Sequence, residues 1–322
     1  MRDTDYAYAV ARIRANESKL LTSSDIELLL SSKSAEDCIK RLIDKGYGNP
    51  AEGYKGDAKL LSGEREKAWS LAEEIVPDKA VLSSLMAAND FHNLKAVIKS
   101  LIADCGYDTL VMHPATISPE EIFAKVKAKD WGKLPDGMTE AAELSYTAFV
   151  EAQNSQLGEA IIDKASLESA IRRSKGAGEL AERLAEQNAA LTDIKIAYRC
   201  MKSGKSKDFM KQSLAECCTV SVDELITASL GGEDDFLRYV ESTKYGGASD
   251  ALRQGMSVFE RWTDSKTVEL ISYAKHKPFS SDPIIAYLTA KETELRSVRI
   301  VLSGKRNGVD EERIRQRIRD LY

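Results

Sequence analysis

Proline is scarce in this sequence: there are seven prolines among 322 residues, and none lies between Pro135 and Pro278. Proline interrupts helices because it has no backbone N–H and its ring clashes with the preceding turn. Sustained alternation of apolar and polar residues, which marks half-buried strands, is also missing. Alanine, leucine, lysine and glutamate, all good helix formers, are plentiful. The sequence therefore predicts an all-α protein.

Long hydrophobic runs are missing as well. No stretch of about 18 apolar residues occurs, so no membrane-spanning helix is expected. The opening residues M-R-D-T-D-Y lack the apolar region of a secretory signal, so none is expected. A net charge of −5 disfavours nucleic acid as a partner.

Cysteine and histidine are few and scattered. The cysteines have no C-x-x-C spacing and fit a reducing cytosol better than a disulfide framework; they are Cys38, Cys105, Cys200, Cys217 and Cys218. His92, His113 and His276 have no histidine or cysteine three or four residues further on, which makes a metal site improbable. No nucleophile–base–acid set is visible. We therefore predict no catalytic, cofactor-binding or metal-binding residue.

Two short segments look like the end of a phosphate-binding loop, namely Ser203–Ser206 (S-G-K-S) and Ser303–Lys305 (S-G-K). Such a loop needs another glycine five residues before its last one, but Arg199 and Arg299 occupy those positions. It also needs a preceding strand, whereas residues 193–201 have a helical pattern. We interpret both segments as glycine caps at helix C-termini.

One pattern recurs about every hundred residues: 89–99 (N-D-F-H-N-L-K-A-V-I-K), 192–199 (T-D-I-K-I-A-Y-R) and 293–299 (T-E-L-R-S-V-R). Each copy has an amide or carboxylate, an aliphatic residue and a base. Its apolar residues follow the i, i+3, i+4, i+7 spacing of one buried helix face. The polar positions are Asn93 and Lys95, Asp193 and Lys195, and Glu294 and Arg296. Because the charged pairs recur, salt-bridge networks or a binding face are favoured over a single active site.

A second recurrent element is a short helix with an apolar face, followed by an aromatic residue. Its copies are expected at 34–43, 119–126, 233–240 and 311–318, followed by Tyr47, Trp131, Tyr245 and Tyr322. Acidic residues in the first turns suit the positive end of the helix dipole.

These recurrences predict three similar helical-bundle domains: residues 1–110, 111–210 and 211–322. The N-terminal stretch, with Tyr6, Val10, Ile13 and Leu20 roughly along one helical face, takes the place of a missing first copy. Packing of the first unit with the C-terminal helix also remains open.

The C-terminal segment is basic, with Arg313, Arg315, Arg317 and Arg319, and Lys305-Arg306 adds to it. A solvated helix face is the favoured interpretation, and a patch for an acidic partner or lipid headgroups is the alternative.

In order and spacing, the motifs resemble those of one family, the C subunit of A/V-type ATPases, which is similar to the d subunit of eukaryotic vacuolar ATPases. The segments that carry the resemblance are Y-A-Y-A-V-A-R-I-R at the start, N-D-F-H-N-L-K-A-V-I-K, D-I-K-I-A-Y-R, and K-E-T-E-L-R-S-V-R-I-V-L-S-G-K-R-N-G-V near the end. The resemblance covers essentially the whole chain.

The resemblance implies a funnel of three helical domains with pseudo-threefold symmetry and no active site. It implies a peripheral rotor subunit on the cytoplasmic side of the membrane, between the proteolipid ring and the central shaft, subunits D and F. Such a subunit transmits the torque that couples ATP hydrolysis or synthesis to proton or sodium transport. Two alternatives remain: a helical scaffold or adaptor unrelated to a motor, and an enzyme with a site between repeats around Gly204–Ser206.

Overall fold

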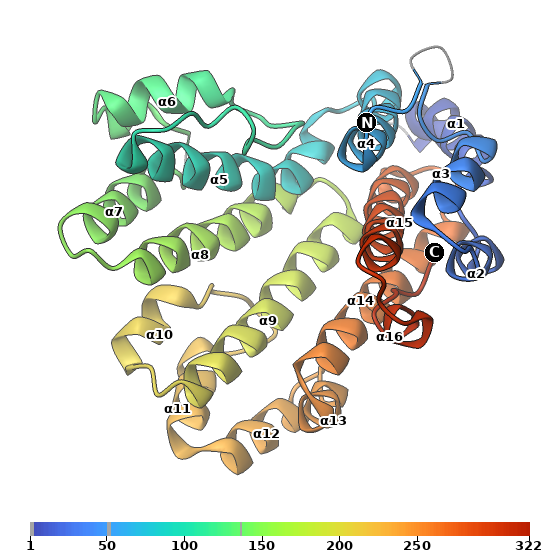
Figure 1. Cartoon of the computed structure of the whole chain (residues 1–322). Coiled ribbons are helices and arrows are strands. Elements are labelled where there is room, and N and C mark those ends of the chain that lie inside the picture. The colour runs from blue at the N-terminus through green and yellow to red at the C-terminus, as the bar shows by residue number, and fades with distance from the viewer. Residues whose placement is uncertain (1–2, 50–52, 136) are drawn as a thin grey trace. The chain divides into compact units, whose positions relative to one another are not determined.

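The computed structural model describes residues 3–49, 53–135 and 137–322, and every regular element in these ranges is a helix (Figure 1). This confirms the all-α prediction. By their contacts the residues divide into two compact units, one made of residues 1–79 and 251–322 and the other of residues 80–250.

The first unit joins the two ends of the chain. It contains η1 (Asp3–Tyr6), α1 (Ala7–Glu17), α2 (Ser23–Leu30), α3 (Ala35–Asp44), α4 (Asp57–Ile75), α14 (Met256–Ser272), η3 (Tyr273–His276), α15 (Asp282–Arg306) and α16 (Glu311–Arg315). The long helix α15 packs against α1, α3, α4 and α14, and it is buried on most of its circumference. One apolar cluster unites Leu30 of α2, Leu42 of α3, Leu302 of α15 and Ile314 of α16.

The second unit contains three long helices, of 24, 20 and 24 residues. Its elements are α5 (Ala80–Ala103), α6 (Pro119–Lys127), η2 (Trp131–Lys133), α7 (Thr139–Val150), α8 (Ser155–Ser174), α9 (Glu179–Lys202), α10 (Lys207–Ser213), α11 (Val222–Gly231) and α12 (Glu233–Ser242). The chain passes from this unit to the first within α13 (Gly247–Gln254). α8 packs against α5, α7, α9 and α10, and α9 also contacts α11 and α12.

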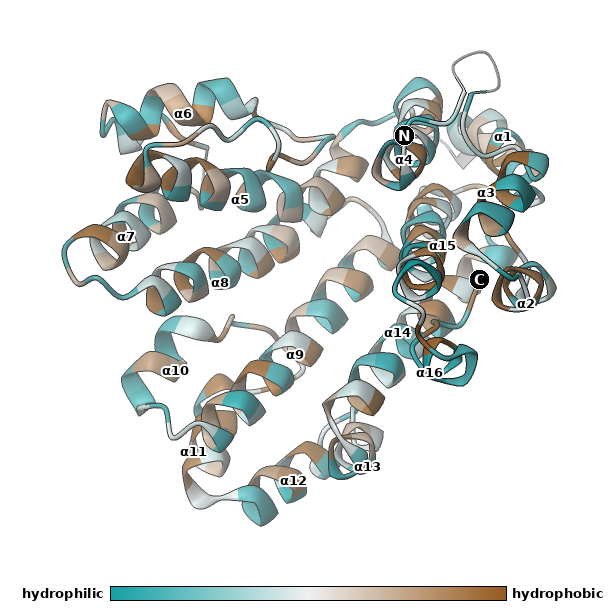
Figure 2. Ribbon diagram, in the orientation of Figure 1, coloured by the Kyte–Doolittle hydropathy of each residue, from teal (hydrophilic) through white to brown (hydrophobic). Residues whose placement is uncertain are grey.

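Apolar and polar residues alternate around the helices of both units. Figure 2 shows hydrophilic residues along every labelled helix, including the long ones. In the part of the chain that the structure describes, no helix has the length and apolar character needed to cross a membrane.

The short helices that precede an aromatic residue are confirmed as α3, α6 and α12. α3 begins at the cap Ser34, whose hydroxyl accepts the Asp37 N–H at 3.2 Å. The helix ends at Asp44. Gly46, two residues further on, has a left-handed conformation (φ 91°), and the Tyr47 N–H donates to the Leu42 carbonyl at 2.9 Å. This Schellman motif places Tyr47 in the core, where it is 2% exposed.

The fourth expected copy, 311–318, is wrong beyond Arg315, because α16 ends there and irregular turns follow. The last residues leave the helical path to reach partners on earlier helices. Arg319 Nε lies 2.6 Å from Asp264 of α14, and the Tyr322 hydroxyl lies 3.4 Å from Glu17 of α1.

At the N-terminus, Tyr6, Val10 and Ile13 are buried as predicted, whereas Leu20 lies beyond the end of α1. The three-domain division at 110/111 and 210/211 concerns internal repeats and stays a prediction.

Candidate functional site

The three polar residues of the recurrent sequence pattern each lie near the middle of a long helix, α5, α9 or α15. Asn93 of α5 and Asp193 of α9 are 0% exposed, and Glu294 of α15 is 1% exposed. A buried polar group is costly unless it is hydrogen-bonded. The partners of these side chains therefore show what each position does.

Asn93 holds the backbone of the segment that follows α5. Its Oδ1 accepts the Met112 N–H at 2.7 Å, and its Nδ2 donates to the Met112 carbonyl at 3.0 Å. The side chain thus satisfies both polar groups of one residue in a loop.

Asp193 does the equivalent in α9, where its carboxylate accepts the Ala215 N–H at 3.1 and 3.2 Å. Burial raises the pKa of Asp193 to about 8, although the Ala215 hydrogen bond and Lys164 oppose the shift. Glu168 and Glu216 add to the rise in this pKa.

Glu294 of α15 holds a segment from the other end of the chain. It accepts the Leu21 N–H at 2.5 Å, a hydrogen bond from the Tyr47 hydroxyl, and one from Lys291 Nζ at 2.6 Å. Burial, followed by the charge of Glu294, raises the pKa of Tyr47. Glu294 therefore ties α15 to two segments from the N-terminal part of the chain, at Leu21 and at Tyr47.

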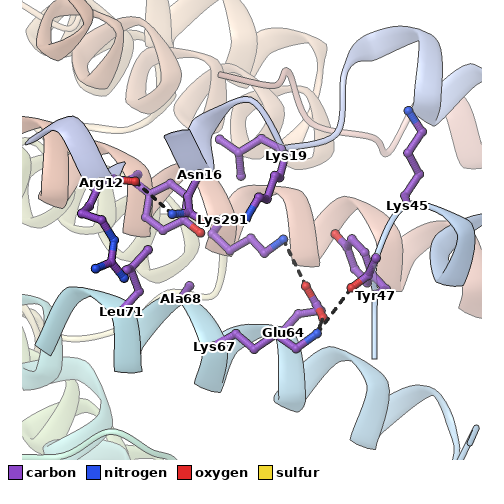
Figure 3. Close-up of a pocket in the computed structure, with 13 residues that line it drawn as sticks. Arg12, Asn16, Lys19, Lys45, Tyr47, Glu64, Lys67, Ala68, Leu71 and Lys291 are labelled. Atoms are coloured by element: carbon purple, nitrogen blue, oxygen red, sulfur yellow. Dashed lines mark hydrogen bonds and ion pairs between the residues drawn. The ribbon is translucent and has the colours of Figure 1, made fainter. Parts of the chain in front are cut away.

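A cavity of about 640 Å³ opens beside this cluster in the first unit, between α1, α4, α15 and the turn after α3 (Figure 3). Its lining carries five cations, Arg12, Lys19, Lys45, Lys67 and Lys291. Cavities of this size can hold small ligands. Whether these cations are available to a ligand depends on the protein groups with which they are already paired.

Carboxylates balance the charge on the floor of the cavity. Lys291 Nζ lies 2.6 Å from Glu294 and 3.5 Å from Glu64, and 4.6 Å from the ring centre of Tyr47. Lys67 Nζ lies 2.6 Å from Glu64 and 2.6 Å from the Gly48 carbonyl. These contacts tie α4, α15 and the turn after α3 together.

The cations at the rim also have partners. Arg12 lies 3.4 Å from Glu74, Lys45 lies 2.7 Å from Asp25, and Lys19 lies 3.1 Å from the Asn16 amide oxygen. The five cations that line the cavity are therefore all paired, and their contacts connect the helices around it. The predicted salt-bridge network is confirmed at Glu294.

The Ser203–Ser206 segment is a helix cap, as predicted. Gly204 (φ 63°) follows the end of α9 and donates its N–H to the Met201 carbonyl at 3.2 Å, and the Lys205 N–H donates to the Cys200 carbonyl at 2.9 Å. The Ser206 hydroxyl then accepts the Phe209 N–H at the start of α10, at 3.2 Å. These backbone groups are used by the helices and do not form a phosphate cradle.

The corresponding prediction for Gly304 is wrong, because Gly304 lies inside α15. The cap is Gly308 (φ 62°), and the Val309 N–H donates to the Gly304 carbonyl at 2.9 Å. Gly304 serves close packing instead: a Cβ at this position would lie 2.5 Å from the Cδ1 of Ile314.

The histidines and cysteines do not gather. His92 Nε2 lies 2.8 Å from the Leu110 carbonyl. Among residues 3–49, 53–135 and 137–322 there is no group of three His, Cys, Asp or Glu side chains that could hold a metal ion. All five cysteines are free thiols, and of these Cys38 and Cys200 are buried.

The C-terminal basic run divides into paired and exposed arginines. Arg315 bonds Glu27 of α2 and lies 3.0 Å from Glu311, and Arg319 pairs with Asp264. Arg313 and Arg317 are exposed. Lys305 and Arg306 are also engaged within the unit, the former with the Leu30 carbonyl and the latter with Asp57 and Glu36.

Sequence reasoning missed the buried Glu64–Lys291 pair. The spacing of Lys291 and Glu294, three residues apart on one helix, was a usable signal. Nothing in the sequence pairs Glu64 with a residue of α15, because that contact depends on the tertiary fold.

The recurrent polar residues Asn93, Asp193 and Glu294 thus hold backbone segments together inside an all-helical chain. The family model for the ATP synthase (C/AC39) subunit matches residues 9–317. The chain belongs to this family, whose members are structural and not catalytic subunits of V/A-type ATPases.

Characterised relatives match over nearly their whole length. The C subunit of the V-type sodium ATPase of Enterococcus hirae is 24% identical, over 96% of this chain and 97% of the relative. The C subunit of the A-type ATP synthase of Desulfurococcus sp. is 26% identical, over 97% and 90%. The C subunit of the V-type ATP synthase of Thermus thermophilus is 24% identical, over 94% of each chain.

Membership of this family makes the chain a subunit of a rotary ATPase complex concerned with ATP synthesis and ion transport. The alternatives of an unrelated scaffold and of an enzyme with a site between repeats are therefore set aside.

Proposed function

We propose that this chain is the rotor subunit of the central stalk, linking the central shaft, subunits D and F, to the membrane proteolipid ring. In this role it transmits the torque that couples ATP hydrolysis or synthesis to proton or sodium transport. It lies on the cytoplasmic side of the membrane as a peripheral part of the complex, and its function uses no catalytic residue, metal or cofactor.

The observation that carries the proposal is the recurrence of one internal brace on three long helices. Asn93, Asp193 and Glu294 are buried near the middle of α5, α9 and α15, and each binds the backbone of a neighbouring segment. A connector that transmits torque must resist deformation. Hydrogen bonds from buried side chains to the backbone give such rigidity because they are strong in the interior.

The proposal includes three domains related by a pseudo-threefold axis and arranged as a funnel. The repeat that contains α15 is completed by α2 and α3 from the N-terminal part of the chain, since Leu21 and Tyr47 bond Glu294. A closed arrangement of three repeats, in which the two ends of the chain share one repeat, accounts for this pairing.

The test is reconstitution of the complex with and without this chain. We expect the complex that lacks it to hydrolyse ATP without ion transport, because the shaft and the ring are uncoupled, and we expect added purified chain to restore transport. A second reconstitution with a helical protein of similar size controls for crowding. Coupled transport without the chain would contradict the proposal.

A further inference from the structure

The loop between α5 and α6, residues 104–118, is held by side chains of α5 along much of its length. His92 Nε2 lies 2.8 Å from the Leu110 carbonyl. Two residues further along this loop, the backbone N–H and carbonyl of Met112 both bond Asn93. The backbone on each side of Val111 is therefore tied to the helix.

The next part of the loop is tied just as closely. Asn89 Nδ2 donates to the Pro114 carbonyl at 2.8 Å, and Asp90 accepts the Thr116 N–H at 2.7 Å. Asp90 is itself 0% exposed and pairs with Arg173 of α8 at 2.5 Å. The loop is thus a preorganised feature, and a preorganised surface loses little conformational entropy when it binds a partner.

This loop presents apolar side chains to solvent. Leu110 is 49% exposed and Met112 is 42% exposed, and Val111 between them is half-buried. We call these three residues the apolar tip. A single exposed apolar residue is ordinary, but consecutive ones on a rigidly held loop indicate an interaction site.

The equivalent segments of the other two repeats lack such a tip. The segment bonded by Asp193 continues from the buried Ala215 to Glu216, Cys217 and Cys218. The segment bonded by Glu294 reaches Leu21 from Ser18, Lys19 and Leu20. The brace recurs three times, but a run of three apolar residues with two of them exposed occurs beside Asn93 and not at these two sites. The apolar tip is therefore a feature of the segment beside Asn93 that the other two segments lack.

The charge of the residues near the apolar tip in the sequence limits which kind of partner can bind it. Residues 100–120 contain no lysine or arginine, while they include three acids, Asp104, Asp108 and Glu120. Anionic membrane surfaces attract basic segments and repel acidic ones. An apolar groove with lysine or arginine at its rim, on a protein, is complementary to both features of the loop.

We propose that the apolar tip inserts into an apolar, basic-rimmed groove on another protein subunit of the same rotary ATPase. This rests on the proposed function, since it assumes that the chain is built into that complex. Leu110, Val111 and Met112 fill the groove, and Asp104, Asp108 and Glu120 of the same stretch of chain face its basic rim.

The test compares two variants in the assembled complex. The first is Leu110→Ser with Met112→Ser, which keeps the hydrogen bonds of the loop because these use backbone groups at both positions. The control is Leu230→Ser, which removes a leucine that is somewhat more exposed (57%) from α11 of the same unit. Labelled chain is incorporated, and its exchange out of the complex is measured together with thermal unfolding of the free chain.

We expect the tip variant to leave the complex at least about tenfold faster than the wild-type chain, with unchanged thermal unfolding, and the control to match the wild type. Equal exchange of both variants overturns the inference while the proposed function stands. Failure of the wild-type chain to assemble overturns the proposed function itself.

A photo-reactive residue at Val111 identifies what the tip touches. We expect an adduct with a subunit of the complex, on a segment that has apolar residues flanked by lysine or arginine. An adduct elsewhere, or none, overturns the inference. So does sedimentation with phosphatidylglycerol vesicles that is lost in the tip variant, because the tip would then bind lipid.

Discussion

Replacing Asp193 by asparagine puts into α9 the residue that α5 carries at the corresponding position, Asn93. The two side chains have the same shape, but only the aspartate can ionise. Asp193 is 0% exposed, and its carboxylate accepts one backbone N–H, from Ala215. Burial raises its pKa to about 8, so the neutral acid predominates in the folded chain at neutral pH.

The pKa shift makes stability depend on pH. An unfolded aspartate has a pKa of about 3.9, so between about pH 4 and pH 8 the folded state binds more protons at Asp193 than the unfolded state does. Its contribution to the free energy of unfolding therefore falls by about 1.4 kcal/mol per pH unit over this interval and is constant above it. At pH 7 the accumulated loss is on the order of 4 kcal/mol, a large share of a typical domain stability.

The assay is urea unfolding of the wild-type chain and Asp193→Asn at half-unit steps from pH 5 to pH 9. We expect the stability difference in favour of the variant to grow steadily up to about pH 8 and then to level off. Asp234→Asn, at an exposed position in α12, serves as the control and should follow the wild type. Parallel curves for Asp193→Asn and the wild type would refute the reasoning, because Asp193 would then be ionised in the folded chain.

Three further predictions concern packing, nucleotide binding and surface charge. Gly304→Ala should destabilise the first unit by about 1–3 kcal/mol in thermal unfolding, because the new Cβ would lie 2.5 Å from Ile314. Adding Ile314→Val should recover part of the lost stability. An unchanged melting temperature for Gly304→Ala would contradict this prediction. Calorimetry with ATP should give no specific binding to the wild-type chain or to Lys205→Ala, since Lys205 uses its backbone N–H to cap α9. Micromolar ATP binding that Lys205→Ala abolishes would contradict the interpretation of this segment as a helix cap. The double variant Arg313→Glu with Arg317→Glu should fold normally but bind its partners in the complex less tightly, most clearly at low salt. The measurement is to wash membranes that carry the variant and to assay the retained ATPase activity and ion transport. Unchanged coupled transport would mean that these exposed arginines are merely solvated.

The helices, and the recurrence of a polar residue at the same position on three of them, could be predicted because they depend on local spacing. The spacing of Leu94, Val97 and Ile98 specifies a buried face of α5, and all three are 0% exposed. Likewise Gly204, in a left-handed conformation after the end of α9, was recognisable as a cap.

What the sequence left undetermined depends on contacts between distant segments. Gly304 has the same S-G-K context as Gly204, yet one lies within a helix and the other ends one. The difference is that α15 continues to Arg306 and packs Ile314 against Gly304, and a sequence pattern does not contain that contact. The exposure of Leu110 and Met112 could not be predicted from the sequence either, because it depends on how α5 holds the loop.

Rotation of this chain in the working complex is the most direct test of its proposed role as a rotor. The catalytic head is immobilised on a surface, a bead is attached to an exposed position of this chain, and the bead is followed while ATP is supplied and withdrawn. The account predicts that the bead turns in one direction during hydrolysis and stops when ATP is removed. A complex that hydrolyses ATP while the bead on this chain stays still would contradict it.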